Sequence, residues 1–191
     1  MKKRILMTFV AASSLMFAAC GGSNNNATPA DNQTATDNKT ATESNAANDA
    51  IIPVDASATL DKTFENDKFS VQYPSALTPK TVEGSDFFIA NESGEVTFNF
   101  TWNTEGPAIS DLQSLLENYV YMLKSQGTVE TQAVKGNKFV IKVSDENTTK
   151  YAFGVMKEDK VGVMGEYSYP KENAADFEKY AGALINSIKF K

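Results

Sequence analysis

Apolar and polar residues alternate along short stretches in the middle of the chain. The clearest is residues 95–102, whose apolar residues fall on one side: Val96, Phe98, Phe100 and Trp102. A period of two predicts a strand with one buried face. Three shorter runs of strand-forming residues precede it: residues 64–65, 69–73 and 87–90. The first two flank a polar turn, so we expect a hairpin at the start of the folded region.

The period changes to that of a helix in residues 110–126. The apolar residues there recur three or four positions apart: Leu112, Leu115, Leu116, Tyr119, Val120 and Leu123. Ser110 and Gln113 have the spacing of a capping box, and Gly127 is a typical stop signal, so these residues predict the two ends of the helix. A second helical pattern predicts a closing helix over residues 174–188.

Four further strands are predicted between the two helices: residues 129–134, 139–143, 150–157 and 161–169. Short turns join them, which indicates antiparallel neighbours. The element order predicts an α+β fold with an antiparallel β-sheet flanked by helices. Neither face of the last two strands is charged in its middle, so we expect both faces of the sheet to be covered by other elements at this point. We also expect Gly154 and Gly162 to let a helix approach closely.

The first 54 residues have a different composition. Residues 1–19 begin with basic residues, continue through an apolar run and end in small residues, which is typical of a secretory signal peptide. Residues 21–50 contain no aromatic or large aliphatic side chain and cannot offset the entropy cost of ordering. We therefore expect a signal peptide over 1–19, a disordered linker over 20–54 and a globular domain over 55–191.

The only cysteine of the chain, Cys20, follows Leu15-Met16-Phe17-Ala18-Ala19 and precedes a glycine. This segment resembles a bacterial lipobox. The resemblance implies cleavage before Cys20, a diacylglyceryl group on its thiol and acylation of the new amino terminus. In many Gram-negative bacteria, an aspartate directly after the modified cysteine keeps a lipoprotein in the inner membrane. Since Gly21 stands at this position, the resemblance also favours the outer membrane if the bacterium is Gram-negative. The alternative is an ordinary signal peptide with an incidental cysteine.

The charge balance narrows the possible functions. The chain has 18 Lys+Arg, 24 Asp+Glu and no His, for a net charge of −6. Loss of Lys2, Lys3 and Arg4 with the signal peptide would make the net charge −9. An acidic chain without a basic cluster disfavours nucleic acid as a partner. The absence of His excludes His-based catalytic triads and His metal ligands, and a single Cys excludes an intrachain disulfide.

Two motifs at the ends of the domain resemble PsbP-like domains, which include bacterial lipoproteins. The first is Phe69-Ser70-Val71-Gln72-Tyr73-Pro74. The second is Phe177-x-x-Tyr180 leading into Leu184-Ile185-Asn186-Ser187-Ile188-Lys189-Phe190. The resemblance implies an α-β-α sandwich and association with larger assemblies.

No combination of residues predicts catalysis, a metal site or a cofactor, so we expect a protein that is not an enzyme. The acidic segments 145–147 and 158–159 lack the ligand spacing of a calcium loop and are interpreted as hairpin tips. Two carboxylates that face each other across an open cleft would instead support an enzyme.

The leading hypothesis is a lipid-anchored accessory module that binds or assembles an envelope protein complex. The alternative is a lipid- or glycan-binding protein with an aromatic ligand face. Its candidate residues are Trp102, Tyr151, Gly154, Gly162 and Tyr167. Aromatic residues at alternate strand positions are also what a sheet core uses.

Overall fold

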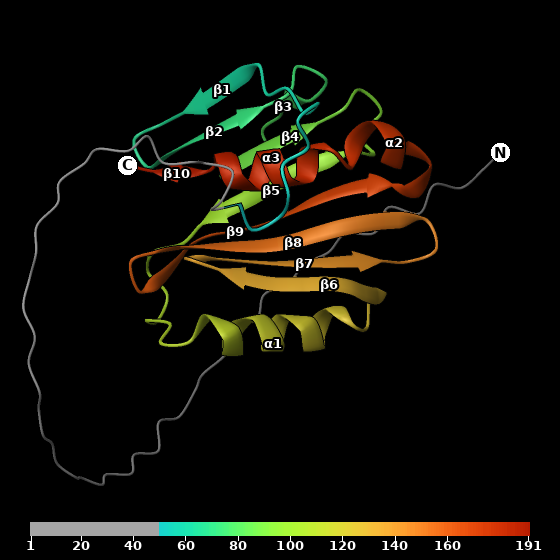
Figure 1. Ribbon diagram of the computed structural model, residues 1–191. Helices are drawn as coiled ribbons and strands as arrows, with labels where there is room; N and C mark the ends of the chain where they lie inside the picture. Colours follow the sequence, from blue (N-terminus) through green and yellow to red (C-terminus); the bar gives the residue numbers. More distant parts are fainter. Residues whose placement is uncertain (1–49) are drawn as a thin grey trace, which may run out of the picture. The chain divides into compact units, whose positions relative to one another are not determined.

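The computed structural model describes residues 50–191 (Figure 1). The predicted signal peptide, Cys20 and most of the predicted linker lie outside these residues. The strands are β1 Lys62–Glu65, β2 Phe69–Tyr73, β3 Thr78–Pro79, β4 Phe87–Ala90, β5 Thr97–Trp102, β6 Thr128–Lys135, β7 Lys138–Ser144, β8 Thr148–Lys157, β9 Lys160–Pro170 and β10 Lys189–Phe190. The helices are α1 Leu112–Leu123, α2 Ala174–Phe177 and α3 Tyr180–Ser187, with a 3₁₀ turn at Lys171–Asn173.

The strands form two sheets. Seven of them follow the order β3-β4-β5-β9-β8-β7-β6, and β1, β2 and β10 form a smaller sheet. Every pair is antiparallel. The fold is therefore α+β with antiparallel strands, as the element order predicts. The sequence pattern did not indicate β3 or β10, which have two residues each.

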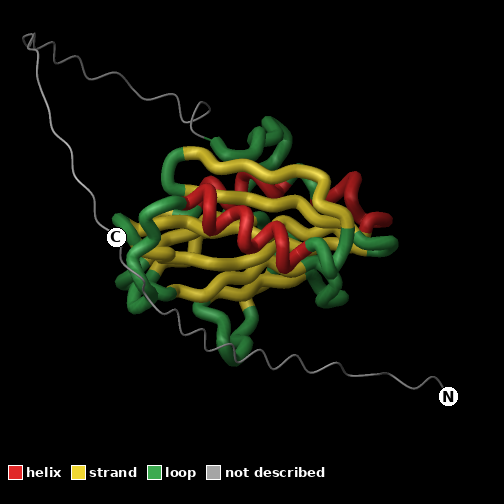
Figure 2. Tube along the Cα trace, turned by 90° about the horizontal axis from the view of Figure 1, so that it is seen from below, coloured by secondary structure: helices red, strands yellow, loops and turns green. Residues whose placement is uncertain are grey.

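We expect both faces of β8 and β9 to be covered, and they are: Phe153 and Tyr167 belong to the main core on one face, and Ala152 and Met164 pack against the cluster under α1 on the other. On one face, α1 packs on alternate residues of β7: Phe139, Ile141 and Val143. Figure 2 shows α1 lying along the strands on this side. On the other face, Leu184 and Ile185 of α3 pack with Phe98, Phe153 and Tyr167. The alternation predicted for β5 is observed, since Val96, Phe98 and Phe100 are fully buried.

The ends of α1 differ from the prediction. The N-cap is Asp111, not Ser110, and its carboxylate accepts hydrogen bonds from the backbone N–H groups of Gln113 and Ser114. The helix ends at Leu123, four residues before Gly127. Gly127 does not adopt the left-handed conformation of a C-cap glycine. It is required for a different reason, because a Cβ there would collide with the carbonyl group of Ser144.

The predicted closing helix is broken between Phe177 and Tyr180. In a continuous helix, the carbonyl oxygen of Phe177 would accept from the N–H of Ala181. Here the carbonyl oxygen of Phe177 accepts from the hydroxyl of Tyr167 at 2.7 Å. The N–H of Ala181 donates instead to the backbone carbonyl of Glu178. After α3, the backbone becomes extended at Ile188, and the chain end pairs with β2.

The expectation that Gly154 and Gly162 admit a helix is wrong. A Cβ at Gly154 would collide with Phe139 and Met164 on the two neighbouring strands, so Gly154 makes room for side chains within the sheet. Gly162 makes room in the same way for the ring of Phe190. Among residues 50–191, no helix is long and apolar enough to cross a membrane.

Candidate functional site

Residues 50–54, which we call the strap, lie across α3 before the first strand begins (Figure 1). Ile51 is buried in the main hydrophobic core, and Ile52 packs against it. The amide of Asn186 on α3 holds the strap by its backbone, accepting from the N–H of Ile51 at 3.4 Å and donating to the carbonyl of Ile52 at 3.3 Å. The folded part of the chain therefore includes residues that precede Asp55, where we expect the domain to begin.

A glycine allows the strap to lie this close to α3. A Cβ on Gly182 would collide with the carbonyl oxygen of Pro53. Because glycine has no Cβ, it allows another backbone to approach the helix closely at this position.

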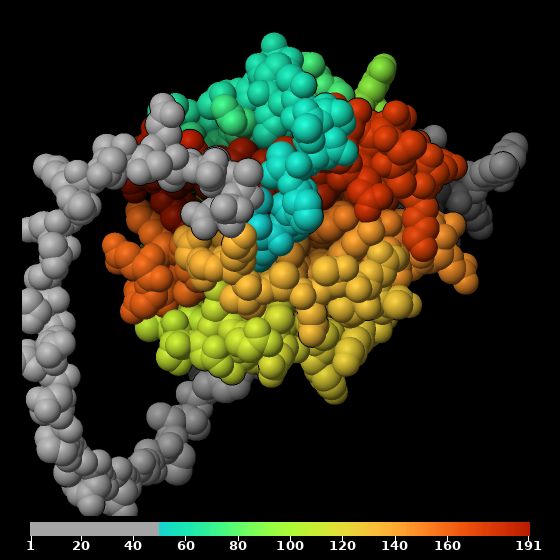
Figure 3. Space-filling model, in the orientation of Figure 1, coloured from blue at the N-terminus to red at the C-terminus, as the bar shows by residue number. Residues whose placement is uncertain are grey.

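A cavity lies on each side of the strap. The larger, of about 580 Å³, is bordered by the strap, by Tyr151 and by α2 and α3. The smaller, of about 210 Å³, lies between the strap and strands β6 and β7, and Tyr151 borders it too. Figure 3 shows the first described residues running between the C-terminal helices and these strands. The strap thus crosses a cleft and fills only part of it.

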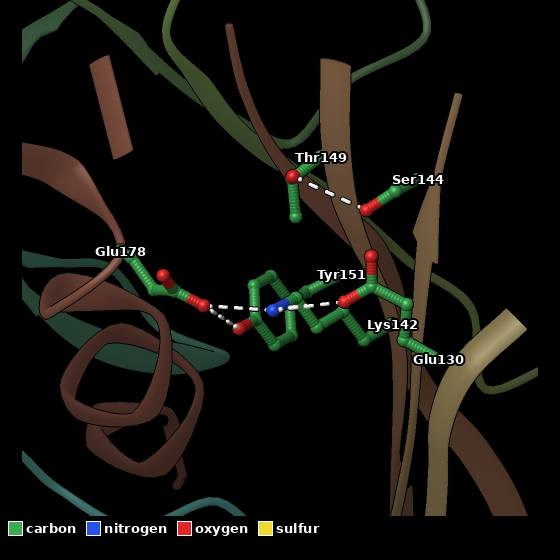
Figure 4. A network of polar contacts seen from close by, with 6 residues as sticks. All are labelled: Glu130, Lys142, Ser144, Thr149, Tyr151 and Glu178. Atoms are coloured by element: carbon green, nitrogen blue, oxygen red, sulfur yellow. Dashed lines mark hydrogen bonds and ion pairs between the residues drawn. The ribbon is translucent and has the colours of Figure 1, made fainter. Parts of the chain in front are cut away.

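A charged network spans this cleft (Figure 4). The ammonium group of Lys142 on β7 lies 3.0 Å from a carboxylate oxygen of Glu130 on β6 and 2.8 Å from one of Glu178, which follows α2. The hydroxyl of Tyr151 on β8 donates to the same oxygen of Glu178 at 3.2 Å. Lys142 also lies 5.7 Å from the centre of the Tyr151 ring. The network therefore joins the sheet to the C-terminal helices.

The network stays charged near neutral pH. Desolvation acts to lower the pKa of Lys142, but hydrogen bonds to Glu178 and Glu130 outweigh it and raise that pKa above its usual value. Hydrogen bonding to Ser144 and to Lys142 lowers the pKa of Glu130. Burial raises the pKa of Tyr151. These shifts favour a protonated Lys142, an ionised Glu130 and a neutral Tyr151 near pH 7.

Two tyrosines lie deeper than Tyr151. Tyr167 and Tyr169 are fully buried, and burial raises the pKa of both hydroxyl groups. The Tyr167 hydroxyl is bound to the carbonyl of Phe177. The Tyr169 hydroxyl has no hydrogen-bond partner of normal geometry among residues 50–191. These side chains belong to the core and do not present a binding surface.

The five residues of the predicted ligand face do not form one surface. Tyr151 and Tyr167 are cross-strand partners, but only Tyr151 borders a cavity. Gly154 lies on the opposite face of the sheet, in the cluster under α1. Trp102 and Gly162 both contact Phe190, which fills the space beside them.

Sequence reasoning missed Lys142, Glu178 and Asn186, which come together only in the folded chain. It also missed the strap, although the run Ile51-Ile52-Pro53-Val54, after a segment without any large apolar side chain, is a signal that could have identified it.

The acidic segments form hairpin turns, as predicted. Asp145 accepts hydrogen bonds from the backbone N–H groups of Asn147 and Thr148 within its own turn. Glu158 occupies the left-handed region with φ of 58° in the turn before β9. No group of three or more acidic, Cys or His residues suited to a metal occurs in the described part of the chain.

No family model matches the chain, and no curated protein matches it.

Proposed function

We propose that this protein is a bacterial envelope lipoprotein, anchored through Cys20, whose domain is a non-catalytic module that binds or assembles an envelope protein complex. The observation that carries the non-catalytic role is the network of Glu130, Lys142 and Glu178. The single ammonium group of this network is paired with both carboxylates, so its base is engaged in ion pairs. A cleft of this kind is suited to binding.

The layer order supports a PsbP-like sandwich as part of this proposal. Helix α1 packs on one face of the large sheet, and α3 packs on the other. The two end motifs that carry the resemblance lie side by side, since β10 pairs with β2 through Phe190 and Phe69. Residues separated by more than 100 positions thus pair within the small sheet.

The proposed anchor determines where the domain works. Each buried acyl CH₂ group contributes about 0.8 kcal/mol, and two or three chains hold a protein firmly where one does not. The chain after the signal peptide would carry a net charge of −9, so anionic headgroups would repel the domain. The polar linker would hold it away from the bilayer, within reach of envelope proteins.

Cross-linking in living cells at native expression tests this proposal, with wild type compared to Cys20→Ser and trapped proteins identified by mass spectrometry. We expect a reproducible envelope partner that is lost with the anchor. A metabolic lipid label should appear on wild type and be absent from Cys20→Ser. An unlabelled wild-type protein would contradict the anchor, and an unchanged set of neighbours in the two strains would contradict the assembly role.

A second candidate, binding of a small lipid or glycan, is favoured by the cavity of about 580 Å³ beside Tyr151. Of the predicted aromatic face, only this tyrosine contributes to it. Thermal shift measurements with envelope lipids and glycans test this candidate. A shift in wild type that disappears in Tyr151→Ala would favour a small ligand over a protein partner.

A further inference from the structure

We infer that the cleft under the strap is a groove for a short peptide, and that an aliphatic segment of a partner protein replaces the strap in it. This inference rests on the proposed binding function and deepens it by naming the chemical class of the partner. The strap is the ligand that the structure itself shows in the groove. Its contacts therefore define what the groove recognises.

The first observation is that the groove holds the backbone of the strap. Asn186 accepts from the N–H of Ile51 and donates to the carbonyl of Ile52. Gly182 contacts the carbonyl of Pro53. Lys135 donates to the carbonyl of Ala50 at 3.2 Å. Because these contacts are made to the main chain, they do not depend on side-chain identity, and another segment with the same backbone course would make them too.

The second observation is that the strap leaves the groove underfilled. Cavities of about 580 and 210 Å³ lie on its two sides, and Ile52 and Pro53 border both. A partner segment with a bulkier side chain in place of Ile52 would extend into the smaller cavity, toward Ala133 and Val140, which border it. It would thereby gain contacts that the strap does not make.

The third observation is that the strap can leave without disrupting a sheet. It belongs to neither sheet, it precedes the first strand, and Val54 at its end is 47% exposed. As a tethered ligand it competes at an effective concentration that is typically in the millimolar range. A partner segment must therefore bind better than the strap, and the size of the cavities provides the means.

These contacts specify the partner. Its segment follows the backbone course of the strap, carries an aliphatic residue at the position of buried Ile51, and carries a larger aliphatic or aromatic residue at the position of Ile52. A residue without an N–H is acceptable at the third position, because the strap has Pro53 there and presents its carbonyl to Gly182.

The test uses the purified chain from residue 20 onward with Cys20→Ser and a fluorescein-labelled peptide with the sequence of residues 50–56. Fluorescence anisotropy compares this protein with a form that also carries Ile51→Ser and Ile52→Ser, which weaken the strap and leave the groove intact. Since apparent affinity scales with the fraction of open groove, we expect the double variant to bind the peptide at least about ten-fold more tightly. A peptide with Ile52→Phe should bind more tightly still.

Two controls show whether binding occurs in the groove. Adding Gly182→Ala to the double variant should abolish binding, because the new Cβ collides with the peptide carbonyl. Adding Gly106→Ala should not change it, because a Cβ there meets only Asn103 at 3.8 Å. A folded double variant that does not bind the peptide, or that binds it equally with Gly182→Ala, would overturn the inference.

Hydrogen exchange of the wild-type chain keeps the test decisive if the double variant does not fold. We expect the N–H of Ile51 to exchange through a local opening, much faster than the core amides of β8. Exchange of Ile51 only with global unfolding would show that the strap never leaves, and would refute displacement. These measurements use neither membrane nor cells, so their failure is distinct from failure of the cross-linking experiment.

Discussion

At the scale of single residues, the buried tyrosines show how one hydroxyl group changes the course of the backbone. The Tyr167 hydroxyl takes the carbonyl of Phe177 that a continuous helix would use, and the helix breaks there. The Tyr169 hydroxyl is equally buried but has no partner of normal geometry in the described part of the chain. Two tyrosines on one strand therefore contribute differently to stability.

Replacing each tyrosine with phenylalanine tests this difference. Tyr167→Phe removes a donor from a buried carbonyl and should lower the free energy of unfolding by about 1–2 kcal/mol. Tyr169→Phe removes a buried hydroxyl that gains no hydrogen bond, and should be neutral or slightly stabilising. Urea unfolding of the two variants measures both values. Equal losses in the two variants would show that the bond to Phe177 has no special role.

The charged network predicts how stability depends on pH. Lys142→Met should cost about 1 kcal/mol at pH 7, because the pair is only partly screened from water. The pKa of Glu130 is lowered in the fold, so its contribution exists above the unfolded pKa of about 4.3 and is lost as pH falls through the folded value. The pKa of Lys142 is raised, so its contribution is lost only as pH rises above about 10.4.

We therefore expect the stability difference between wild type and Lys142→Met to be constant from about pH 5 to pH 9 and to shrink below about pH 4. Denaturant midpoints measured across this range check the prediction. A difference that changes between pH 6 and 8 would indicate that another titrating group controls the network.

At the scale of elements, α1 depends on a cap one residue away from the position that the sequence pattern indicates. Asp111 binds two backbone N–H groups and also accepts from the hydroxyl of Ser114. These hydrogen bonds lower the pKa of Asp111, most strongly the one from Ser114. The aspartate is therefore charged at neutral pH at the helix N-terminus, where the helix dipole favours an anion.

Capping can be tested with two neighbouring substitutions. Asp111→Ala should lower the free energy of unfolding by about 1 kcal/mol, which is typical for loss of an N-cap. Ser110→Ala is the matched control and should change it by less than about 0.5 kcal/mol. Thermal unfolding followed by circular dichroism compares them. A larger loss for Ser110→Ala than for Asp111→Ala would indicate that Ser110 is the N-cap, as the capping-box pattern predicts.

At the scale of the whole molecule, the two ends of the domain are joined by Phe190. Its strand pairs with β2, and its ring lies 5.4 Å from that of Trp102, in an edge arrangement. Trp102 also stacks against Phe69 at 6.1 Å. Because Trp102 is the single tryptophan of the chain, its fluorescence reports on how the chain end packs against it.

Phe190→Ala should open the space beside Trp102 and Gly162. We expect a red shift of tryptophan emission and a loss of about 2 kcal/mol of stability, since Phe190 is only partly buried. The far-ultraviolet circular dichroism should stay close to that of wild type. Unchanged emission would show that the chain end does not shield Trp102 in solution.

Elements with a local sequence pattern could be predicted. The period of two in β5 and the helical spacing in α1 follow from the geometry of neighbouring residues, so the longer strands, the first helix and the α+β class were predictable, whereas the two-residue strands β3 and β10 were not. The short turns between β6 and β9 made their antiparallel order predictable as well.

Only the tertiary structure decided the rest, because it depends on contacts between distant residues. The break before α3 requires Tyr167 to meet Phe177, and the strap requires Asn186 to meet Ile51, 135 positions away. The predicted ligand face failed for the same reason. Alternation assigns a residue to a face of its own strand, but the packing of helices and chain ends decides whether that face is filled or open.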